Sequence, residues 1–527
     1  TQKARINNNY NNDIGGNNNN NGRNNNDNIK NLTNINFTKE EENVLNRGYK
    51  FNYPHTNTNK TKLNIVVESE IAINGLNTNN KDIIKFNIAE EIKEITDNIQ
   101  QPNNKEKQLL STIKSINNKL KLNKAMHIKS DKGNAIVIMS EEEYLNKTTH
   151  FFNENNISKM KRDPTDKFQR EIKKLIKNKS YIFDIEDKNN TNKTNRHLIN
   201  NRPSAPVFKG LPKTHKNDVP IRPIINSINA PNYKISKMMA KKLKDTIELN
   251  NLYVVKNSYE LIDKLKNIKI TNSTRMASFD IVNLYTNVPI KETICTIKEY
   301  LTKNKYTKIF INDIEDILTT ITNQNYFKLK DDVYKQNEGI PMGNPLSGIL
   351  AEIFLQNLEN NQCKNLIEKY KIKFMARYVD DILLIYDEGV TDITQVQNSF
   401  NNLNNNIKYT IEKEKNNRIN YLDLTITRSA NTIEYNIYRK PSHSDICIHN
   451  SSRHPIQHKL STFNSLIHRL INIPMSKENY DNELNYIKGL ATKNGYKNKI
   501  IHNIIKKKQN KKNLNSTTAL TPVNDDS

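Results

Sequence analysis

Apolar residues recur along the chain with two different periods, and the dominant period changes between regions. From residue 31 to about 200 they mostly follow the spacing of amphipathic helices, as in "FNIAEEIKEITDNI" and "FQREIKKLIKNK". Thr38 with Glu41 three residues later forms a capping box, which predicts the start of a helix. The β-branched run "GNAIVIM" (133–139) follows a turn and predicts a short strand. This region is therefore predicted to be a mainly helical N-terminal extension.

The middle of the chain is patterned for strands. Five prolines between residues 201 and 230 predict extended chain and turns rather than a long helix. "MASFDIVNLY" and "FMARYVDDILLIY" are the best strand candidates, and a helical run, "LSGILAEIFLQNLENNQ", lies between them. After residue 401, a strand pair around "YLDLTITR" and "TIEYNIYR" precedes amphipathic helices. The pattern predicts a mixed α/β (α+β) fold.

Both ends of the chain are polar. Residues 1–30 are Asn-rich and of low complexity, and we interpret them as disordered. Residues 506–527 form a basic, polar tail that begins "KKKQNKK". The first residue is Thr1 rather than Met, which indicates a fragment of a longer reading frame.

Composition narrows the class of partner. The chain has 81 Lys and Arg against 56 Asp and Glu, a formal charge of +25, which favours nucleic acid ahead of an anionic membrane. No apolar run reaches the roughly 18 residues that a membrane-spanning helix needs. The three cysteines lack paired spacing, which argues against a disulfide framework and favours a reducing compartment.

Three carboxylates carry the candidate chemistry. Asp280 ends one predicted strand, and the adjacent Asp380 and Asp381 interrupt an apolar, β-prone run. Burying an ionised carboxylate is costly without compensation, so the pair lies in an exposed turn or holds a metal. Two-metal phosphoryl transfer requires such carboxylates at neighbouring strand ends, around two Mg²⁺ ions roughly 3.5–4 Å apart. The three residues are predicted to be catalytic metal ligands, with Mn²⁺ as the substitute ion.

A loop and helix, "GIPMGNPLSGILAEIF" (339–354), separate the two carboxylate strands. Its glycines and prolines predict a rigid loop, and Ser347 is positioned to cap the helix that follows. Gly343 would leave room for backbone contact with the template and the incoming base. The alternative is an ordinary loop that precedes a core helix.

Asp280 with Tyr285, then "PMG…S", then "YVDD", resemble in order and spacing the palm motifs of reverse transcriptases. The finer likeness is to Penelope-like retroelements: "SDKGNAIVIMSEEEY" resembles their "ADKG-VVVM" block, and "GLPKTHKNDVPIRPIINS" resembles their "GLPKIHK…PLRPIVSS" block. "IYRKPSHSDICIHNSSRHPIQHK" resembles a further block, and the likeness covers about residues 31–505.

The resemblance implies a right-hand polymerase. Residues 31–200 would form the helical N-terminal extension and the start of the fingers, and residues 201–390 the fingers and palm, with an antiparallel sheet plus helices. Residues 391–505 would complete the palm and form a largely helical thumb. The implied reaction is RNA-directed DNA synthesis for a retrotransposon. An RNA template, a DNA primer and dNTPs would be its partners, with no membrane.

The resemblance also assigns roles to single residues. Tyr285 would be the steric gate that excludes a ribose 2′-hydroxyl, and Lys132 and Arg222 would grip the triphosphate. Gly343 and Ser347 would support the incoming nucleotide. The expected nucleic-acid contacts are Lys213, His215, Lys216, Arg439 and Lys440.

The chain departs from the family pattern in two places. It reads "PMGNPLSG" where relatives often read "AMGSPLSP", which places Asn344 and Gly348 at these positions. Nothing after Tyr496 resembles the GIY-YIG endonuclease of many members, so the chain is truncated or its lineage lacks that domain. A telomerase-like reverse transcriptase and a catalytically inactive, nucleic-acid-binding relic remain the alternatives. A nuclear location is expected from the function alone.

Overall fold

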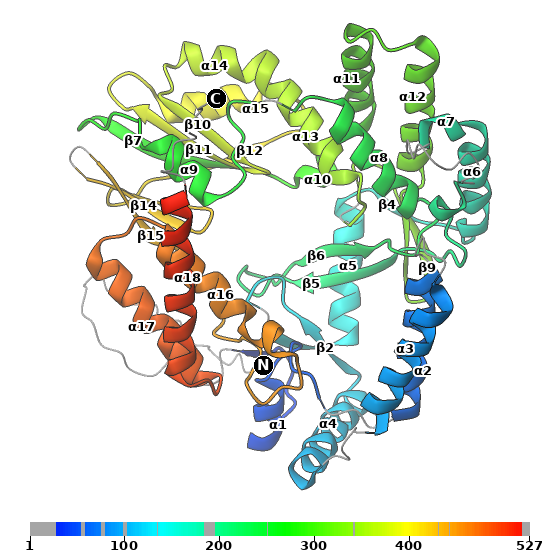
Figure 1. The fold of residues 1–527 in the computed structure, drawn as a ribbon. Helices are drawn as coiled ribbons and strands as arrows, with labels where there is room; N and C mark the ends of the chain where they lie inside the picture. The colour runs from blue at the N-terminus through cyan, green and yellow to red at the C-terminus, as the bar shows by residue number, and fades with distance from the viewer. Residues whose placement is uncertain are drawn as a thin grey trace, which may run out of the picture.

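The computed structural model describes residues 28–53, 58–74, 80–97, 103–133, 135–183, 195–249, 251–340, 343–429, 432–441 and 443–518. Within these residues, helices pack around four β-sheets (Figure 1). This mixed α/β architecture confirms the predicted fold class. We call the sheet that contains β7 and β11 the palm sheet, and the sheet that contains β5 and β6 the fingers sheet.

The palm sheet is antiparallel and has the strand order β10-β11-β7-β12. Its strands are β7 (Thr274–Ile281), β10 (Phe374–Tyr378), β11 (Asp381–Asp387) and β12 (Tyr409–Lys413). Both predicted central strands are confirmed, and the second candidate forms the β10–β11 hairpin. Successive side chains of β11 alternate between two cores: Ile382 and Leu384 pack with helices, whereas Leu383 and Ile385 pack with a second sheet. Burial of both faces explains the unbroken apolar run after Asp381.

Helices cover one face of the palm sheet and continue the structure away from it (Figure 1). The helix predicted between the two carboxylate strands is confirmed as α13 (Ser347–Leu358), which leads through a π-helical turn (Glu359–Cys363) into α14 (Lys364–Lys369). The other helices of this region are α8 (Tyr233–Thr246), α10 (Leu284–Asn287), α11 (Ile290–Lys303), α12 (Lys308–Asn323) and α15 (Ile393–Asn401). Helix α9 (Ser258–Leu265) packs in the core on the opposite face of the sheet.

The fingers sheet has the order β4-β9-β8-β5-β6. Its strands are β4 (Ile157–Lys159), β5 (Val207–Pro212), β6 (Ile221–Asn226), β8 (Tyr326–Leu329) and β9 (Asp332–Gln336). The hairpin of β5 and β6 confirms the extended chain predicted between residues 201 and 230. Helices α5 (Glu141–Glu154), α6 (Thr165–Asn178) and α7 (Ser180–Phe183) and the 3₁₀ helix η1 (Asn195–Leu198) accompany this sheet.

The N-terminal extension is mainly helical, as predicted. It contains α1 (Lys39–Leu45), α2 (Thr58–Asn74), α3 (Lys81–Asp97) and α4 (Asn104–Leu122), with the strands β1 (Ile29–Asn31), β2 (Ala125–Lys129) and β3 (Ile136–Ser140). The capping box of Thr38 and Glu41 and the strand predicted after residue 133 are both confirmed. The prediction of disorder is wrong at its end, because Ile29 pairs in parallel with Ile136. Residues 1–27 lie outside the described residues.

The C-terminal part begins with the strand pair that the sequence predicts. β13 (Arg418–Tyr421), β14 (Leu424–Arg428) and β15 (Ile433–Ile437) form a sheet that packs against the palm, and three helices follow: α16 (Ile456–Asn472), α17 (Lys477–Lys493) and α18 (Asn498–Thr518). α18 runs past residue 506, so the predicted polar tail begins as a helix. The first turns of α18 are amphipathic, and the helix continues from them into the lysine-rich segment.

The N-terminal extension contacts the segment just before α16 (Figure 1). Arg453 forms an ion pair with Glu106 of α4 at 2.6 Å, and the backbone N–H of Asn52 donates to the Ser452 hydroxyl at 2.9 Å. These contacts link the N-terminal extension to the C-terminal helices. Among the described residues, no helix combines the length and the apolar character needed to cross a bilayer.

Candidate active site

The three predicted carboxylates come together at one end of the palm sheet. Asp280 lies directly opposite Asp381 in the antiparallel register of β7 and β11. Asp380 lies in the short turn between β10 and β11, and its carbonyl accepts a hydrogen bond from the N–H of Ile281 at 3.1 Å. The two interpretations of the Asp pair are thus compatible, since the pair occupies a hairpin turn beside a third carboxylate.

The charges at this edge oppose one another. Burial, then the neighbouring charges of Asp380 and Asp280, raise the pKa of Asp381 to about 6. The pKa of Asp280 is also raised, by burial and by Asp380, against the opposing effect of nearby lysines. Carboxylates crowded in this way favour the approach of a cation.

The donor set suits a hard divalent cation. Mg²⁺ and Mn²⁺ prefer carboxylate oxygens as ligands. Three carboxylates lie close together here, two on adjacent strands and one in the neighbouring turn. Within the described ranges, no group of three or more His, Cys, Asp or Glu side chains is placed so that it could hold a metal ion. The three aspartates therefore suit a divalent cation by the chemistry of their oxygens, and their role as metal ligands stays a prediction.

A cavity of about 520 Å³ adjoins the carboxylates. Asp280 and Asp381 line it from the palm sheet, Lys132 from the loop before β3, and Tyr438 and Lys440 from the segment after β15. Acidic and basic groups thus face each other across a space of the size that small-molecule ligands occupy.

Cations of the fingers gather around one buried acid. The Asp131 N–H donates to the Pro212 carbonyl at 2.9 Å, which attaches the loop before β3 to β5. The Asp131 carboxylate, only 6% exposed, lies 2.7 Å from Nε of Arg222 on β6. Burial first, and then repulsion among the neighbouring cations, lowers the pKa of Lys132 and of Lys213. The predicted triphosphate-binding cations are thus placed together, and Asp131 is a partner that the sequence did not indicate.

The other predicted nucleic-acid contacts have different surroundings. His215 and Lys216 are exposed in the turn between β5 and β6, and Lys440 is exposed near the carboxylates. Arg439 instead forms a two-bond ion pair with Glu483 of α17, and its guanidinium stacks 3.8 Å from the centre of the Tyr486 ring. Lys440 therefore faces the site, whereas Arg439 ties the segment after β15 to the C-terminal helices.

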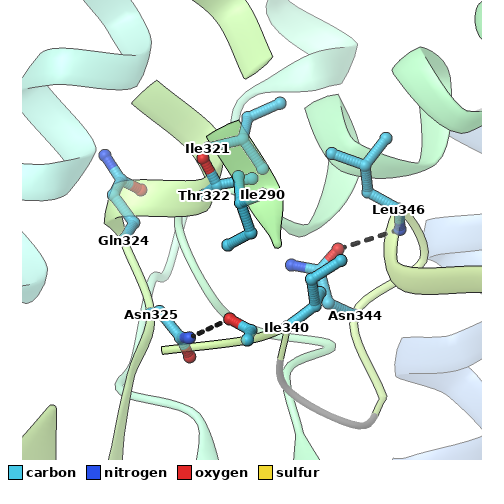
Figure 2. A pocket seen from close by; sticks show the side chains of 9 residues that line it. Ile290, Ile321, Thr322, Gln324, Asn325, Ile340, Asn344 and Leu346 are labelled. Carbon is cyan, nitrogen blue, oxygen red and sulfur yellow. Dashed lines mark hydrogen bonds between the residues drawn. The ribbon is translucent and has the colours of Figure 1, made fainter. Parts of the chain in front are cut away.

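Two hydrogen bonds anchor the loop before α13. The Asn325 side-chain amide donates to the Gly339 carbonyl at 3.0 Å (Figure 2). The Ile340 N–H donates to the Tyr285 carbonyl at 2.7 Å. The apolar residues behind the loop leave a cavity of only about 10 Å³, enough for one water molecule at most. Tyr285 belongs to α10. The pKa of its phenol is raised, mainly because the ring is partly buried and also because the Asp380 charge is nearby. The predicted steric gate thus lies on a supported backbone near the carboxylates.

Gly343 lies against the fingers sheet. Its φ of +98° is in the left-handed region, and an added Cβ would lie 2.1 Å from the Ile225 carbonyl oxygen of β6. The Ser227 hydroxyl donates to the Gly343 carbonyl at 2.9 Å. Gly343 thus permits a close approach between the loop and β6 of the fingers sheet. Its predicted contact with the template and the incoming base stays a prediction.

The predicted helix cap at Ser347 is wrong. Leu346 occupies the N-cap position without a side-chain cap, and Ser347 is the first residue of α13. Asn344, one of the two residues that depart from the family pattern around the start of this helix, accepts a hydrogen bond from the Leu346 N–H at 2.9 Å through its side-chain oxygen, as Figure 2 shows. Asn side chains often bond the backbone two residues ahead, and this local turn shapes the chain before the helix.

The mixed α/β fold, with three aspartates at one end of an antiparallel sheet, is the arrangement expected of a right-hand polymerase. Residues 214–462 match the model of the reverse transcriptase (RNA-dependent DNA polymerase) family, and residues 446–506 match that of the animal helix-turn-helix domain. The first of these segments is therefore similar to the reverse transcriptase domain of RNA-directed DNA polymerases. The second match covers α16, α17 and the start of α18, the region predicted as thumb.

The telomerase reverse transcriptase of Oxytricha trifallax is 27% identical over 183 residues, which are 32% of this chain and 16% of that protein. Among solved structures, telomerase from Candida albicans with a fragment of telomeric RNA aligns with a TM-score of 0.46 and 13% identity, over 75% of this chain and 69% of that one. Apo telomerase from Candida tropicalis aligns with a TM-score of 0.43 and 13% identity, over 89% and 80% of the two chains.

Proposed function

We propose that the chain is an RNA-directed DNA polymerase that adds deoxynucleotides to a primer 3′-hydroxyl on an RNA template. The observation that carries the proposal is the convergence of Asp280, Asp380 and Asp381 at one edge of the palm sheet, opposite the cations of the fingers. This edge lies within the segment that matches the reverse transcriptase family.

Different residues are assigned to different parts of the nucleotide-addition reaction. The primer 3′-oxygen attacks the dNTP α-phosphorus, a new phosphodiester bond forms, and pyrophosphate leaves. Lys132 and Arg222 bind the triphosphate oxygens, and Asp131 orients Arg222 through their ion pair. The three aspartates would hold two Mg²⁺ ions, which when bound supply a lowered hydroxyl pKa and charge stabilisation for the leaving group.

Tyr285 is expected to select deoxyribose. Replacing it with Ala opens space beneath the sugar and should raise the efficiency of ribonucleotide addition, relative to deoxynucleotide addition, by about 100-fold. Tyr285→Phe retains the ring and should retain the selectivity. The measurement is kcat/KM for matched ribo- and deoxynucleotides in single-nucleotide extension. An unchanged ratio in Tyr285→Ala would remove the residue from sugar selection.

Lys216 is expected to contact a backbone phosphate. Lys216→Ala should weaken binding of an RNA–DNA duplex and lower the slope of log affinity against log salt by about one phosphate contact. Lys364, an exposed lysine at the start of α14, provides the matched control and should leave both quantities unchanged. The measurement is fluorescence anisotropy at several salt concentrations, and equal slopes for the two variants would contradict the assignment.

Two sequence likenesses support two different biological settings. Blocks resembling Penelope-like retroelements support a retrotransposon reverse transcriptase, which would work in the nucleus. The identity shared with a telomerase reverse transcriptase instead supports a telomerase-like enzyme with a dedicated RNA. Sequencing the RNA that co-purifies from cells separates them, since one abundant RNA with a short repeated template favours the second.

The proposal is tested by primer extension with the purified chain, a DNA primer on an RNA template, four dNTPs and Mg²⁺. Products that lengthen to the template end are expected. A folded chain that binds the duplex without extending it would contradict the proposal and support a binding-only relic.

A further inference from the structure

Arg377, three residues before Asp380, is completely buried. A guanidinium is rarely removed from water unless charged partners surround it, so the position calls for an explanation. Burial would lower its pKa, but the neighbouring carboxylates outweigh burial and keep the group ionised.

Two glutamates hold most of the guanidinium. Glu352 of α13 accepts from Nη2 at 2.9 Å and from Nη1 at 3.1 Å. Glu359, at the start of the π-helical turn, accepts from Nε and, at 3.1 Å, from Nη2. Asn251 donates a further hydrogen bond to Glu359. The planar fork of Arg377 is therefore fixed in the palm interior.

The same guanidinium reaches the catalytic turn. Nη1 donates to the Val379 carbonyl at 3.0 Å. Val379 has a φ of +56°, an unfavourable conformation for a β-branched residue that persists only where surrounding contacts enforce it. Val379 directly precedes Asp380, so the Arg377 contact holds the backbone that carries a predicted metal ligand.

Further bonds fix the two strands on either side of the turn. The Arg377 backbone exchanges hydrogen bonds with Tyr253 and Val255, at 2.7 and 2.9 Å. The buried Tyr421 hydroxyl lies within hydrogen-bond distance of the Ala376 and Asp381 carbonyls, at 3.1 and 2.9 Å. The strands are thus supported by backbone and tyrosine contacts, whereas the Val379 carbonyl itself is held by Arg377.

We propose that Arg377 is a positioning residue: it links α13 to the catalytic turn and holds Val379 in the conformation that directs Asp380 toward the ligand site. The inference rests on the proposed polymerase function and deepens it. A purely structural role, in which the ion pairs only stabilise the palm, is the competing account.

Arg377→Lys separates the two accounts, because lysine keeps the charge that the glutamates require but lacks the fork that also reaches Val379. We expect kcat for single-nucleotide addition to fall by about 10–100-fold, with the dNTP KM and the duplex Kd changed by less than about threefold. Mn²⁺ affinity should fall about 10-fold, measured by electron paramagnetic resonance in a complex with a dideoxy-terminated primer and a dNTP.

Arg428→Lys is the matched control. Arg428 is also buried and pairs with Glu414 at 2.8 Å, but it lies at the far end of β14, where its guanidinium also donates to Asn417. It should lose stability without losing Mn²⁺ affinity. Equal effects of the two variants on Mn²⁺ affinity and kcat would overturn the proposal.

A second variant distinguishes a strained turn from a general loss of folding. Glycine adopts positive φ without cost, so Arg377→Lys with Val379→Gly should recover at least about fivefold of the lost kcat. Glycine restores none of the ion pairs, so a purely structural role predicts no recovery. If neither variant folds, Arg377 serves the core and the proposal is rejected. Absence of extension by the wild-type chain would instead reject the polymerase function, while the Mn²⁺ comparison would still test positioning.

Discussion

Replacing Asp380 by Asn is expected to lower the rate of nucleotide addition by about 1,000-fold or more, with little effect on duplex binding. Asparagine has nearly the same shape but lacks the negative charge that a divalent cation requires. The side chain lies in a turn whose neighbours remain in place, so the fold should persist. Single-turnover extension with saturating dNTP measures the loss, and anisotropy measures binding.

The matched control lies on the same strand. Asp387 ends β11, about 20 Å from Asp381 at the usual rise per residue, and bonds Ser273 and Lys373 instead of facing the cavity. Asp387→Asn should change the addition rate by less than about twofold. Comparable losses in both variants would mean that lost carboxylate charge acts through stability rather than through the proposed site.

Gly343→Ala is expected to destabilise the chain by about 3 kcal/mol and to lower kcat/KM at least 10-fold. The added Cβ would lie 2.1 Å from the Ile225 carbonyl, and the left-handed backbone disfavours alanine independently of the available space. The loop must then move away from β6. Because Ile340 in the same loop bonds the Tyr285 carbonyl, the displacement should also reach the sugar-binding side of the site.

Replacing Gly348, five residues later, by Ala is expected to have the opposite effect on stability. Gly348 lies in α13, and an added Cβ would meet nothing within 4 Å, so Gly348→Ala should stabilise the helix by about 0.5–1 kcal/mol. Urea unfolding followed by circular dichroism compares the two variants. A Gly343→Ala chain as stable and active as wild type would show that the loop and β6 do not require their close contact.

Much of the site could be predicted because its signals are local in sequence. The runs on either side of Asp280 and of Asp380 with Asp381 are apolar and β-branched, and each turn follows directly. The Thr38 capping box is likewise complete within four residues. Such patterns specify an element and its end, and the palm sheet then places the carboxylates together.

The contacts that the sequence did not indicate join distant segments. Asp131 pairs with Arg222, and the Ser227 hydroxyl bonds the Gly343 carbonyl. Arg377 pairs with Glu352 of α13 and with Glu359 of the π-helical turn. None of these pairs has a periodic signature. Isolated polar residues in apolar runs, such as Arg377 before "YVDD", were the only available signal.

The wrong predictions have local causes. A serine at the start of a helix favoured a cap at Ser347, but Asn344 makes the turn that shapes this entry instead. The Asn-rich pattern concealed Ile29, whose strand pairing depends on β3, more than 100 residues away. The basic, polar tail predicted from residue 506 stays a prediction, and its first residues continue the helix that begins at Asn498.

The most direct test of the central claim is template-coded addition of one nucleotide. Four RNA templates that differ only at the first unpaired base are each annealed to the same DNA primer, and each dNTP is supplied alone with Mg²⁺. The account predicts that the purified chain adds the complementary deoxynucleotide in each case and adds the other three far more slowly. Addition that ignores the template base, or no addition by a folded chain that binds all four duplexes, would contradict RNA-directed DNA synthesis at this site.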